Sequence, residues 1–382
     1  MTDISETLVG MIEDERRNKP AQARDTRYLF GPVMDFLFLG GASLIILPLV
    51  FLYVPIEKFD AFYLIMSIYL INVINHPHFI HSYQLFYENF RTKLFSPEHN
   101  FQMRSRFFVA GIVVPVVLTG FFLFSYFTQN VKLVVFSVNA MIFFVGWHYV
   151  KQGYGMAIVD SVLKKAYYSN REKKILLVTS YISWICTWLI FNDAIRESDY
   201  HGVKYYAINI PEQGELSVLM ILLACCLFAL RLFINKAFND KGKTPYNGMI
   251  AYFVSIYIWL LVIKIDPICA LLVPAFHGLQ YIIVVWRFQL NRLAATRAEK
   301  TAMTIQAVMP FFLSAVVIGF VLLFALPIVL QQYVKTPDVM QGIIFFPVAI
   351  WVTVNIQHYF MDNVIWRKEN AEVRKYLFGA PK

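Results

Sequence analysis

Long apolar segments alternate with short polar ones along most of the chain. Windows of about 20 apolar residues, the length that crosses about 30 Å of hydrocarbon, begin near ten positions: Phe30, Asp60, Phe107, Val131, Lys174, Leu216, Gly248, Pro267, Ile305 and Met340. This pattern predicts an all-α, polytopic membrane bundle of about ten transmembrane helices. The second, fourth, eighth and tenth windows are interrupted by histidines and other polar residues, so the number of helices could differ from ten by one.

Composition supports a membrane protein over a soluble enzyme with a single anchor. The 382 residues are 58% hydrophobic, 17% aromatic and 15% charged, with a mean hydropathy of +0.55. No linker rich in proline, glycine or serine separates the apolar windows. We therefore expect one transmembrane helical domain at 29–366, between a cytoplasmic N-terminal segment at 1–28 and a cytoplasmic C-terminal tail at 367–382.

The basic residues set the expected orientation, because short cytoplasmic loops are enriched in lysine and arginine. With a cytoplasmic N-terminus, most of the 34 basic residues fall on the cytoplasmic side. The exceptions are Lys58, Lys132, Arg196, Lys204, Lys264 and Lys335. Both termini are then cytoplasmic. The net charge of +9 is spread over every inner loop instead of one patch, so we expect no nucleic-acid partner. Arg287 and Arg367 follow tryptophans at helix ends, as interfacial anchors do.

Six of the eight histidines lie inside predicted membrane helices, where ionisable groups are costly and usually functional. All six are on the four windows that cross from the outer to the cytoplasmic face, and most fall in the cytoplasmic half. We therefore expect them to converge on one buried metal site. Their motifs are Asn75-His76-Pro77-His78-Phe79-Ile80-His81, Trp147-His148-Tyr149, Phe276-His277-Gly278 and Gln357-His358-Tyr359. His99 and His201 are expected to be solvated loop residues.

Helical spacing indicates which polar side chains accompany the histidines. His78 and His81 are three residues apart and share a helical face, while His76 needs a kink at Pro77 to join them. Asp362 is four residues after His358, so it is expected to be either a ligand or an acid that orients a ligand. Asp35 lies at comparable depth. Asp362 and Asp35 are the candidate catalytic acids, and Gln152 and Gln280 are placed to hydrogen-bond beside His148 and His277.

The chemistry of this set favours a transition metal. Imidazole suits iron, copper and zinc, whereas calcium and magnesium prefer oxygen ligands. Two irons or one are possible, and iron with open positions for dioxygen would attack unactivated carbon, whereas a single zinc would hydrolyse or hydrate. The candidate ligands are His76, His78, His81, His148, His277, His358 and Asp362.

Two other classes of protein remain open. A b-type haem protein would pair two histidines across a porphyrin, for example His148 with His358, and would leave the histidines of the second window without a role. A transporter for protons or metal ions could also use histidines near the membrane centre. However, no inverted repeat is visible, and the histidines gather toward one face.

These motifs resemble those of the histidine-rich integral-membrane non-haem iron oxygenases, including the bacterial Brp/Blh β-carotene dioxygenase family. The resemblance rests on His148, His277, and His358 with Asp362, together with the cluster from His76 to His81. The chain lacks that family's Pro-His-Gly and paired-histidine motifs. It also lacks the HxxHH boxes of fatty-acid desaturases and hydroxylases, because it has only His78-x-x-His81.

The resemblance implies iron, dioxygen and a lipophilic small-molecule substrate, leaving the substrate and reaction type open. On this basis we expect a multi-pass oxygenase of a bacterial inner membrane, in contact with membrane lipids and served by an electron donor protein.

Overall fold

The structure is a computed structural model that describes residues 27–54, 59–97, 99–195, 199–200, 202–239, 243–258, 272–296, 305–340, 342–367 and 369–378. Several sequence predictions lie outside these residues. These predictions concern most of the N-terminal segment, the start of the eighth window at Pro267, His201 and the end of the C-terminal tail.

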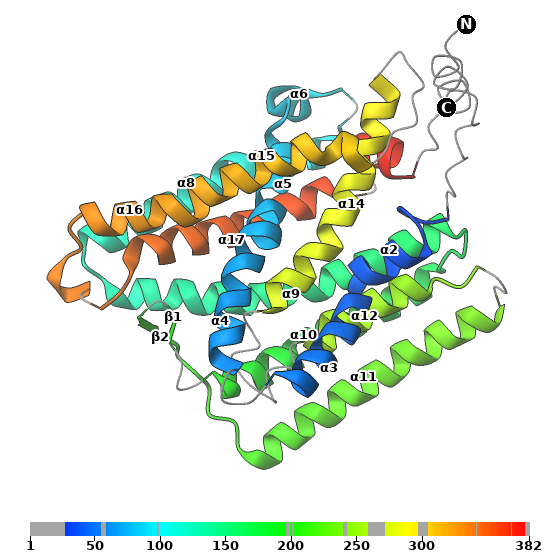
Figure 1. Ribbon diagram of the computed structural model, residues 1–382, viewed down its shortest axis with the longest axis horizontal. Helices are drawn as coiled ribbons and strands as arrows, with labels where there is room; N and C mark the ends of the chain where they lie inside the picture. Colours follow the sequence, from blue (N-terminus) through cyan, green and yellow to red (C-terminus); the bar gives the residue numbers. More distant parts are fainter. Residues whose placement is uncertain are drawn as a thin grey trace, which may run out of the picture.

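The described residues are almost entirely helical, which confirms the predicted fold class (Figure 1). A two-residue antiparallel pair, β1 (Asp199–Tyr200) and β2 (Val203–Lys204), provides the strand in this part of the chain. The α-helices are α2 (Pro32–Phe36), α3 (Ala42–Tyr53), α4 (Phe59–Leu70), α5 (His76–Tyr87), α6 (Phe90–Phe95), α7 (Phe101–Phe108), α8 (Val114–Phe127), α9 (Val131–Leu163), α10 (Asn170–Ala194), α11 (Glu212–Asn239), α12 (Tyr246–Tyr257), α14 (Val273–Thr296), α15 (Met309–Gly319), α16 (Leu326–Tyr333), α17 (Phe345–Ile365) and α18 (Ala371–Val373).

Six helical runs in the described chain are long and apolar enough to cross a membrane. They are Pro32–Tyr53, Phe101–Phe127, Val131–Leu163, Asn170–Asp193, Glu212–Asn239 and Gln306–Tyr333. The predicted count of ten is not confirmed. Helices α5, α14 and α17 lie where the sequence predicts three of the other spans, but their histidines and polar residues lower their hydropathy.

Several long helices contain a π-helical turn just before a proline. These turns are Ile71–Asn75 before Pro77, Val109–Val113 before Pro115 and Phe320–Ala325 before Pro327. A proline has no N–H to donate, and its ring clashes with the carbonyl four residues earlier, so the preceding turn widens. Further π-helical turns span Leu37–Gly41 and Arg374–Phe378, and 3-10 turns span Ile305–Val308 and Asp338–Met340. The irregularity predicted at Pro77 is therefore present.

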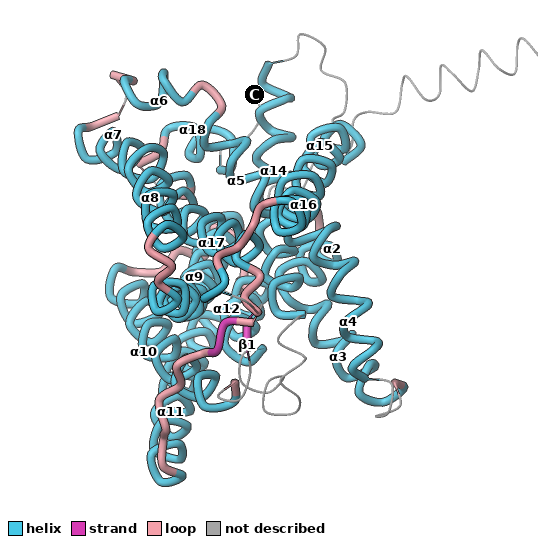
Figure 2. Tube along the Cα trace, turned by 90° about the vertical axis from the view of Figure 1, so that its left-hand side faces the viewer, coloured by secondary structure: helices cyan, strands magenta, loops and turns pink. Residues whose placement is uncertain are grey.

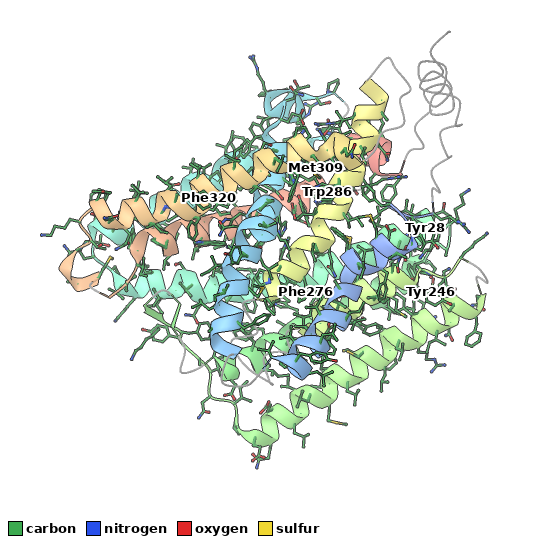
Figure 3. The ribbon with its side chains drawn as sticks, in the orientation of Figure 1. Tyr28, Tyr246, Phe276, Trp286, Met309 and Phe320 are labelled. Atoms are coloured by element: carbon green, nitrogen blue, oxygen red, sulfur yellow. The ribbon has the colours of Figure 1, made fainter. Side chains whose placement is uncertain are left out.

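The 33-residue helix α9 organises the bundle. It packs against α10, α12 and α17, while α5 packs against α14, α15 and α17. Figure 2, turned by 90°, places α9 and α17 side by side near the middle of this assembly. The surrounding helices carry most of the exposed apolar side chains. In Figure 3, Phe320 lies on the outer run of α15 and α16, whereas Phe276 and Trp286 lie on α14 in the interior.

Two polar residues are more buried than the sequence suggests. The prediction that His99 is solvated is wrong, because its ring is buried against Phe107 and its Nδ1 lies 2.8 Å from the Lys93 carbonyl oxygen. Arg287 is only 3% exposed, and its guanidinium donates to the carbonyl of Leu29. It therefore ties the segment just before α2 to α14 inside the protein.

Candidate metal centre

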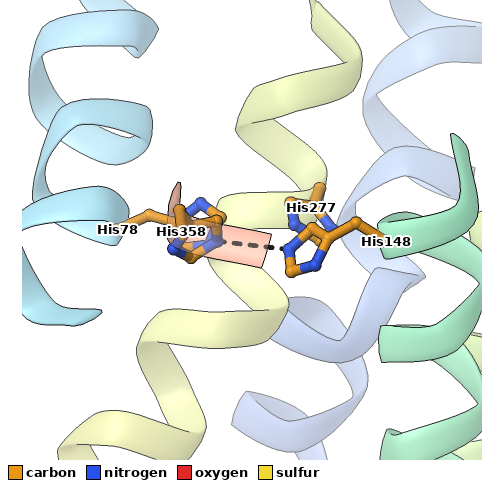
Figure 4. A group of neighbouring side chains, drawn as sticks. All are labelled: His78, His148, His277 and His358. Atoms are coloured by element: carbon orange, nitrogen blue, oxygen red, sulfur yellow. Dashed lines mark hydrogen bonds between the residues drawn. The ribbon is translucent and has the colours of Figure 1, made fainter. Parts of the chain in front are cut away.

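Four histidines from four helices meet in the middle of the protein. They are His78 on α5, His148 on α9, His277 on α14 and His358 on α17. One ring nitrogen of each lies within 4.8 Å of the others, and their exposed fractions run from 0 to 6%. Figure 4 shows His78 and His358 facing His148 and His277. The convergence that the sequence predicts is thus found for four of the six intramembrane histidines.

The spacing of these nitrogens suits a single metal ion. The Nε2 atoms of His148 and His358 are 3.2 Å apart, and the ring centres of neighbouring histidines are 4.5 to 5.0 Å apart. Nitrogens that each bind one ion at about 2.1 Å lie roughly 3 to 4 Å from one another. The 4.8 Å limit on the distances between the four nitrogens is close to this range. The described residues can therefore hold a metal here.

The hydrogen bonding of the four rings is incomplete. Both nitrogens of His78, Nε2 of His277 and Nδ1 of His358 are buried, without a hydrogen-bond partner among the described residues. Leaving a buried polar group unsatisfied costs about 1 to 3 kcal/mol each. A cation bound at this position would take the lone pair of one nitrogen from each ring. The donor set consequently fits a transition metal that accepts neutral imidazole nitrogen.

Asp362 borders the centre and is held from behind. Its Oδ2 lies 3.3 Å from His358 Nε2 and 3.9 Å from His148 Nε2. Its Oδ1 accepts hydrogen bonds from Ser82 Oγ at 2.9 Å and from Tyr281 Oη at 3.0 Å. One carboxylate oxygen is thus fixed, and the other faces the histidines. This geometry allows Asp362 to bind a metal or to orient His358, the two roles that the sequence left open.

Ser82 and Tyr281 were not singled out from the sequence, although a signal was present. Ser82 is four residues after His78 and Tyr281 four after His277, the same spacing that pairs Asp362 with His358. Residues four apart share a helical face. The three polar partners therefore lie on the same side of their helices as the histidines. The hydroxyl oxygens of Ser82 and Tyr281 are 2.5 Å apart, so these two side chains form one network with Asp362.

Close packing between helices fixes the positions of these side chains. A Cβ atom on Gly278 would come within 2.9 Å of Ile74 Cγ2, so glycine allows α14 to approach the π-helical turn before α5. Tyr149 stacks on His277 with ring centres 3.7 Å apart. Gln152 donates to the His277 backbone carbonyl, which joins α9 to α14. These contacts restrict how far the rings can move.

His76 and His81 are buried on α5 but lie outside the four-histidine group. His76 packs against Trp351 with ring centres 5.1 Å apart. His81 stacks on Phe311 at 4.4 Å, and its Nδ1 lies 2.9 Å from Gln84 Oε1. The His81 ring faces α15, and the His76 ring faces α17 at Trp351, seven residues before His358. The structure does not bring these two predicted ligands to the centre.

The other candidate acid, Asp35, has a local role in the structure. Its carboxylate accepts hydrogen bonds from the backbone N–H groups of Leu29, Phe30 and Gly31. Carboxylates with several backbone donors commonly fix a chain turn or a helix start. The structure thus places Asp35 at the entry to α2, separate from the histidine group, and a catalytic role for it stays a prediction.

The chain matches no protein-family model, and neither a curated protein nor a solved structure similar to it was found. The function of the protein is therefore inferred from the geometry of the four-histidine group.

Proposed function

We propose that the protein is a membrane oxygenase whose four-histidine centre binds one iron ion and uses dioxygen on a lipophilic substrate. The observation that carries this proposal is the meeting of four buried imidazoles from separate helices, with an acid at their edge. A single group of four supports one ion per chain over two. Iron held by imidazole, with positions left open, supplies the activation of dioxygen.

The residues of the chain contribute position and environment. Four helices present their imidazoles already gathered, so little ordering would accompany metal binding. Ser82 and Tyr281 hold Asp362 against rotation, and Asp362 in turn keeps a carboxylate oxygen beside His358. Partners of this kind fix ligand orientation and raise ligand basicity. The apolar surroundings exclude water, which protects reactive oxygen chemistry from side reactions.

The possible reactions differ in whether they need electrons from a donor protein. If both oxygen atoms of dioxygen enter the substrate across a carbon–carbon double bond, two carbonyls form and no external electrons are needed. Hydroxylation of a C–H bond would instead require two electrons and two protons from a donor protein, with the second oxygen atom leaving as water.

A b-type haem is the less favourable alternative. A porphyrin would have to lie between two of these rings, but the His148 and His358 nitrogens are already 3.2 Å apart, and His78 and His277 pack against them. The four rings thus occupy the space that the macrocycle would need. A mononuclear ion fits the group without displacing any helix.

Metal analysis of the purified protein tests the proposal. We expect about one iron per chain by inductively coupled plasma mass spectrometry, with no Soret absorption. Membranes supplied with ¹⁸O₂ should yield ¹⁸O-labelled lipid products that depend on the protein. An absence of metal, a Soret band, or stoichiometric zinc in place of iron would each contradict the proposal.

A further inference from the structure

Three cationic side chains converge at one end of the four-histidine centre. Lys151 lies on α9, Arg106 in the last turn of α7 and Arg367 just after α17. Helix α17 packs against both α7 and α9. All three residues are half-buried. Electrostatic interactions connect Lys151 with both arginines, and the arginines with each other. Like charges repel, so such a grouping is unfavourable unless something negative joins it.

Lys151 turns into the protein instead of reaching for the water. Its Nζ donates to Asn363 Oδ1 at 2.5 Å and lies 4.5 Å from the centre of the Trp147 ring. Arg367 Nε donates to the backbone carbonyl of the same Asn363 at 2.8 Å. Two cations therefore donate to one neutral residue, Lys151 to its side chain and Arg367 to its backbone. An interfacial anchor, the role that the sequence favours for Arg367, would extend toward the lipid head groups.

Among the described residues, two acids lie near this group, and they offset its three positive charges only in part. Asp362 is in electrostatic range of Lys151, but its two oxygens are directed to Ser82 and Tyr281 and to the histidines. Glu369 interacts with Arg367. Burial, and next repulsion from Arg106, lower the pKa of the Arg367 guanidinium from its ordinary value. A bound metal would add further positive charge, so the unbalanced charge favours an anion.

The group also lies close to the centre. Lys151 is three residues after His148, about 4.5 Å further along α9, and Asn363 directly follows Asp362. Asn363 is five residues after His358, about 7.5 Å further along α17, so an anion bound by Lys151 and the arginines would sit within about two helical turns of the four imidazoles. The same position is at the predicted cytoplasmic edge of the membrane, where the head group of a lipid lies.

We propose that Lys151, Arg106 and Arg367 bind the anionic head group, a carboxylate or a phosphate, of an amphiphilic substrate whose apolar chain extends to the four-histidine centre. This inference rests on the proposed function, because it defines the substrate class of that site. It also restricts the reaction to the part of the chain nearer the head group.

Binding of oleate to the purified full-length protein in a neutral detergent tests this assignment without any variant. Oleyl alcohol has the same chain without the charge, so we expect it to bind at least about tenfold more weakly, the size of effect given by charge-assisted hydrogen bonds. An 18:1 lysophosphatidate separates a phosphate preference from a carboxylate preference. Inorganic phosphate at millimolar concentration should not displace oleate, and displacement would show a site for free anions instead.

Variants then assign the residues. Lys151→Gln should weaken oleate binding about tenfold, and Lys151→Arg should restore most of it because the charge returns. Arg231→Gln, which removes an exposed cation on α11, should have no effect. Equal binding of oleate and oleyl alcohol, or unchanged binding in Lys151→Gln, would overturn the inference.

Iron content, measured on the same samples, separates the two proposals. If oleate fails to discriminate while iron remains at one per chain, the head-group site is wrong and the proposed function stands. If oleate binds through Lys151 to a protein that takes up no iron, the head-group site stands and the proposed function is wrong.

Discussion

The four-histidine centre and the pair His76 and His81 use the same residue type at similar depth, and they share helix α5. All six rings are buried, and both sets contain nitrogens without hydrogen-bond partners among the described residues. What differs is their surroundings. The four rings face one another, whereas His76 faces Trp351 and His81 faces Phe311. Burial and depth alone therefore do not identify a metal ligand, and the direction of the side chain around the helix decides.

Helical rotation explains this division on α5. At about 100° per residue, Ser82 lies about 40° from His78 on one side, and His81 lies about 60° from it on the other. Ser82 consequently reaches Tyr281 and Asp362, while His81 faces α15. Residues that the sequence places on one face of a helix can therefore contact two different neighbouring helices.

The largest expected effect comes from removing one of the four histidines. His148→Ala and His358→Ala should each reduce bound iron by at least tenfold, because a lost ligand weakens the whole site. His76→Ala and His81→Ala, the matched controls from the other set, should keep about one iron per chain. Mass spectrometric metal analysis of the four variants checks this contrast. Equal loss of iron in both sets would contradict the division into two sets, and it would indicate that His76 and His81 are also ligands.

A smaller effect is expected at Asp362. Asp362→Asn keeps the shape and the acceptor for Ser82 and Tyr281 but removes the charge beside His358, so iron affinity should fall about 10- to 100-fold. A chelator titration measures this change. Asp160→Asn is a suitable control, because Asp160 is a buried acid on α9 that binds Lys164 and the Gly248 N–H instead. Unchanged affinity in Asp362→Asn would limit Asp362 to hydrogen bonding with its two hydroxyl partners.

The hydroxyls behind Asp362 should matter less singly than together. Tyr281→Phe leaves Ser82 as a donor to the same oxygen, so we expect less than a tenfold loss in iron affinity. The double variant Ser82→Ala/Tyr281→Phe removes both donors to that oxygen. Its loss of iron-binding free energy should exceed the sum of the losses in the two single variants. The same chelator titration distinguishes these cases, and strict additivity would argue against a shared network.

The smallest effect on the metal is expected beside His76. A Cβ atom on Gly319 would lie 2.7 Å from the Cβ of His76, so Gly319→Ala should lower stability by about 1 to 3 kcal/mol through overpacking. Iron content should stay unchanged, because only the second set of histidines is disturbed. Gly120→Ala, where a Cβ would meet nothing within 4 Å, should keep the wild-type midpoint in thermal unfolding. Loss of iron in Gly319→Ala would show that His76 communicates with the centre.

The sequence predicts the helical membrane fold well, because about 20 apolar residues in a row have few other uses. It also predicts the meeting of His78, His148, His277 and His358, because the spans predicted to carry them cross in one direction and place them at similar depth. The count of spans is harder, because the polar residues that build the centre lower the hydropathy of the helices that hold it.

Other features depend on packing that the sequence does not reveal. The rotation of α5 directs His76 to Trp351 on α17 and His81 to Phe311 on α15. The apolar pattern of the sequence does not identify these two neighbours. His99 is buried by a stack on Phe107 within a segment that reads as a polar loop. Ser82 and Tyr281 could have been found from their four-residue spacing after a histidine, but serine and tyrosine are common in membrane helices.

The proposed function depends on one metal ion bound by the four converging imidazoles. Iron K-edge X-ray absorption of the reconstituted protein tests it most directly, because imidazole rings give a distinctive multiple-scattering pattern. We expect about four imidazole ligands on a mononuclear iron, reduced to three in His148→Ala. A spectrum with at most one imidazole, or one unchanged by His148→Ala, would contradict it.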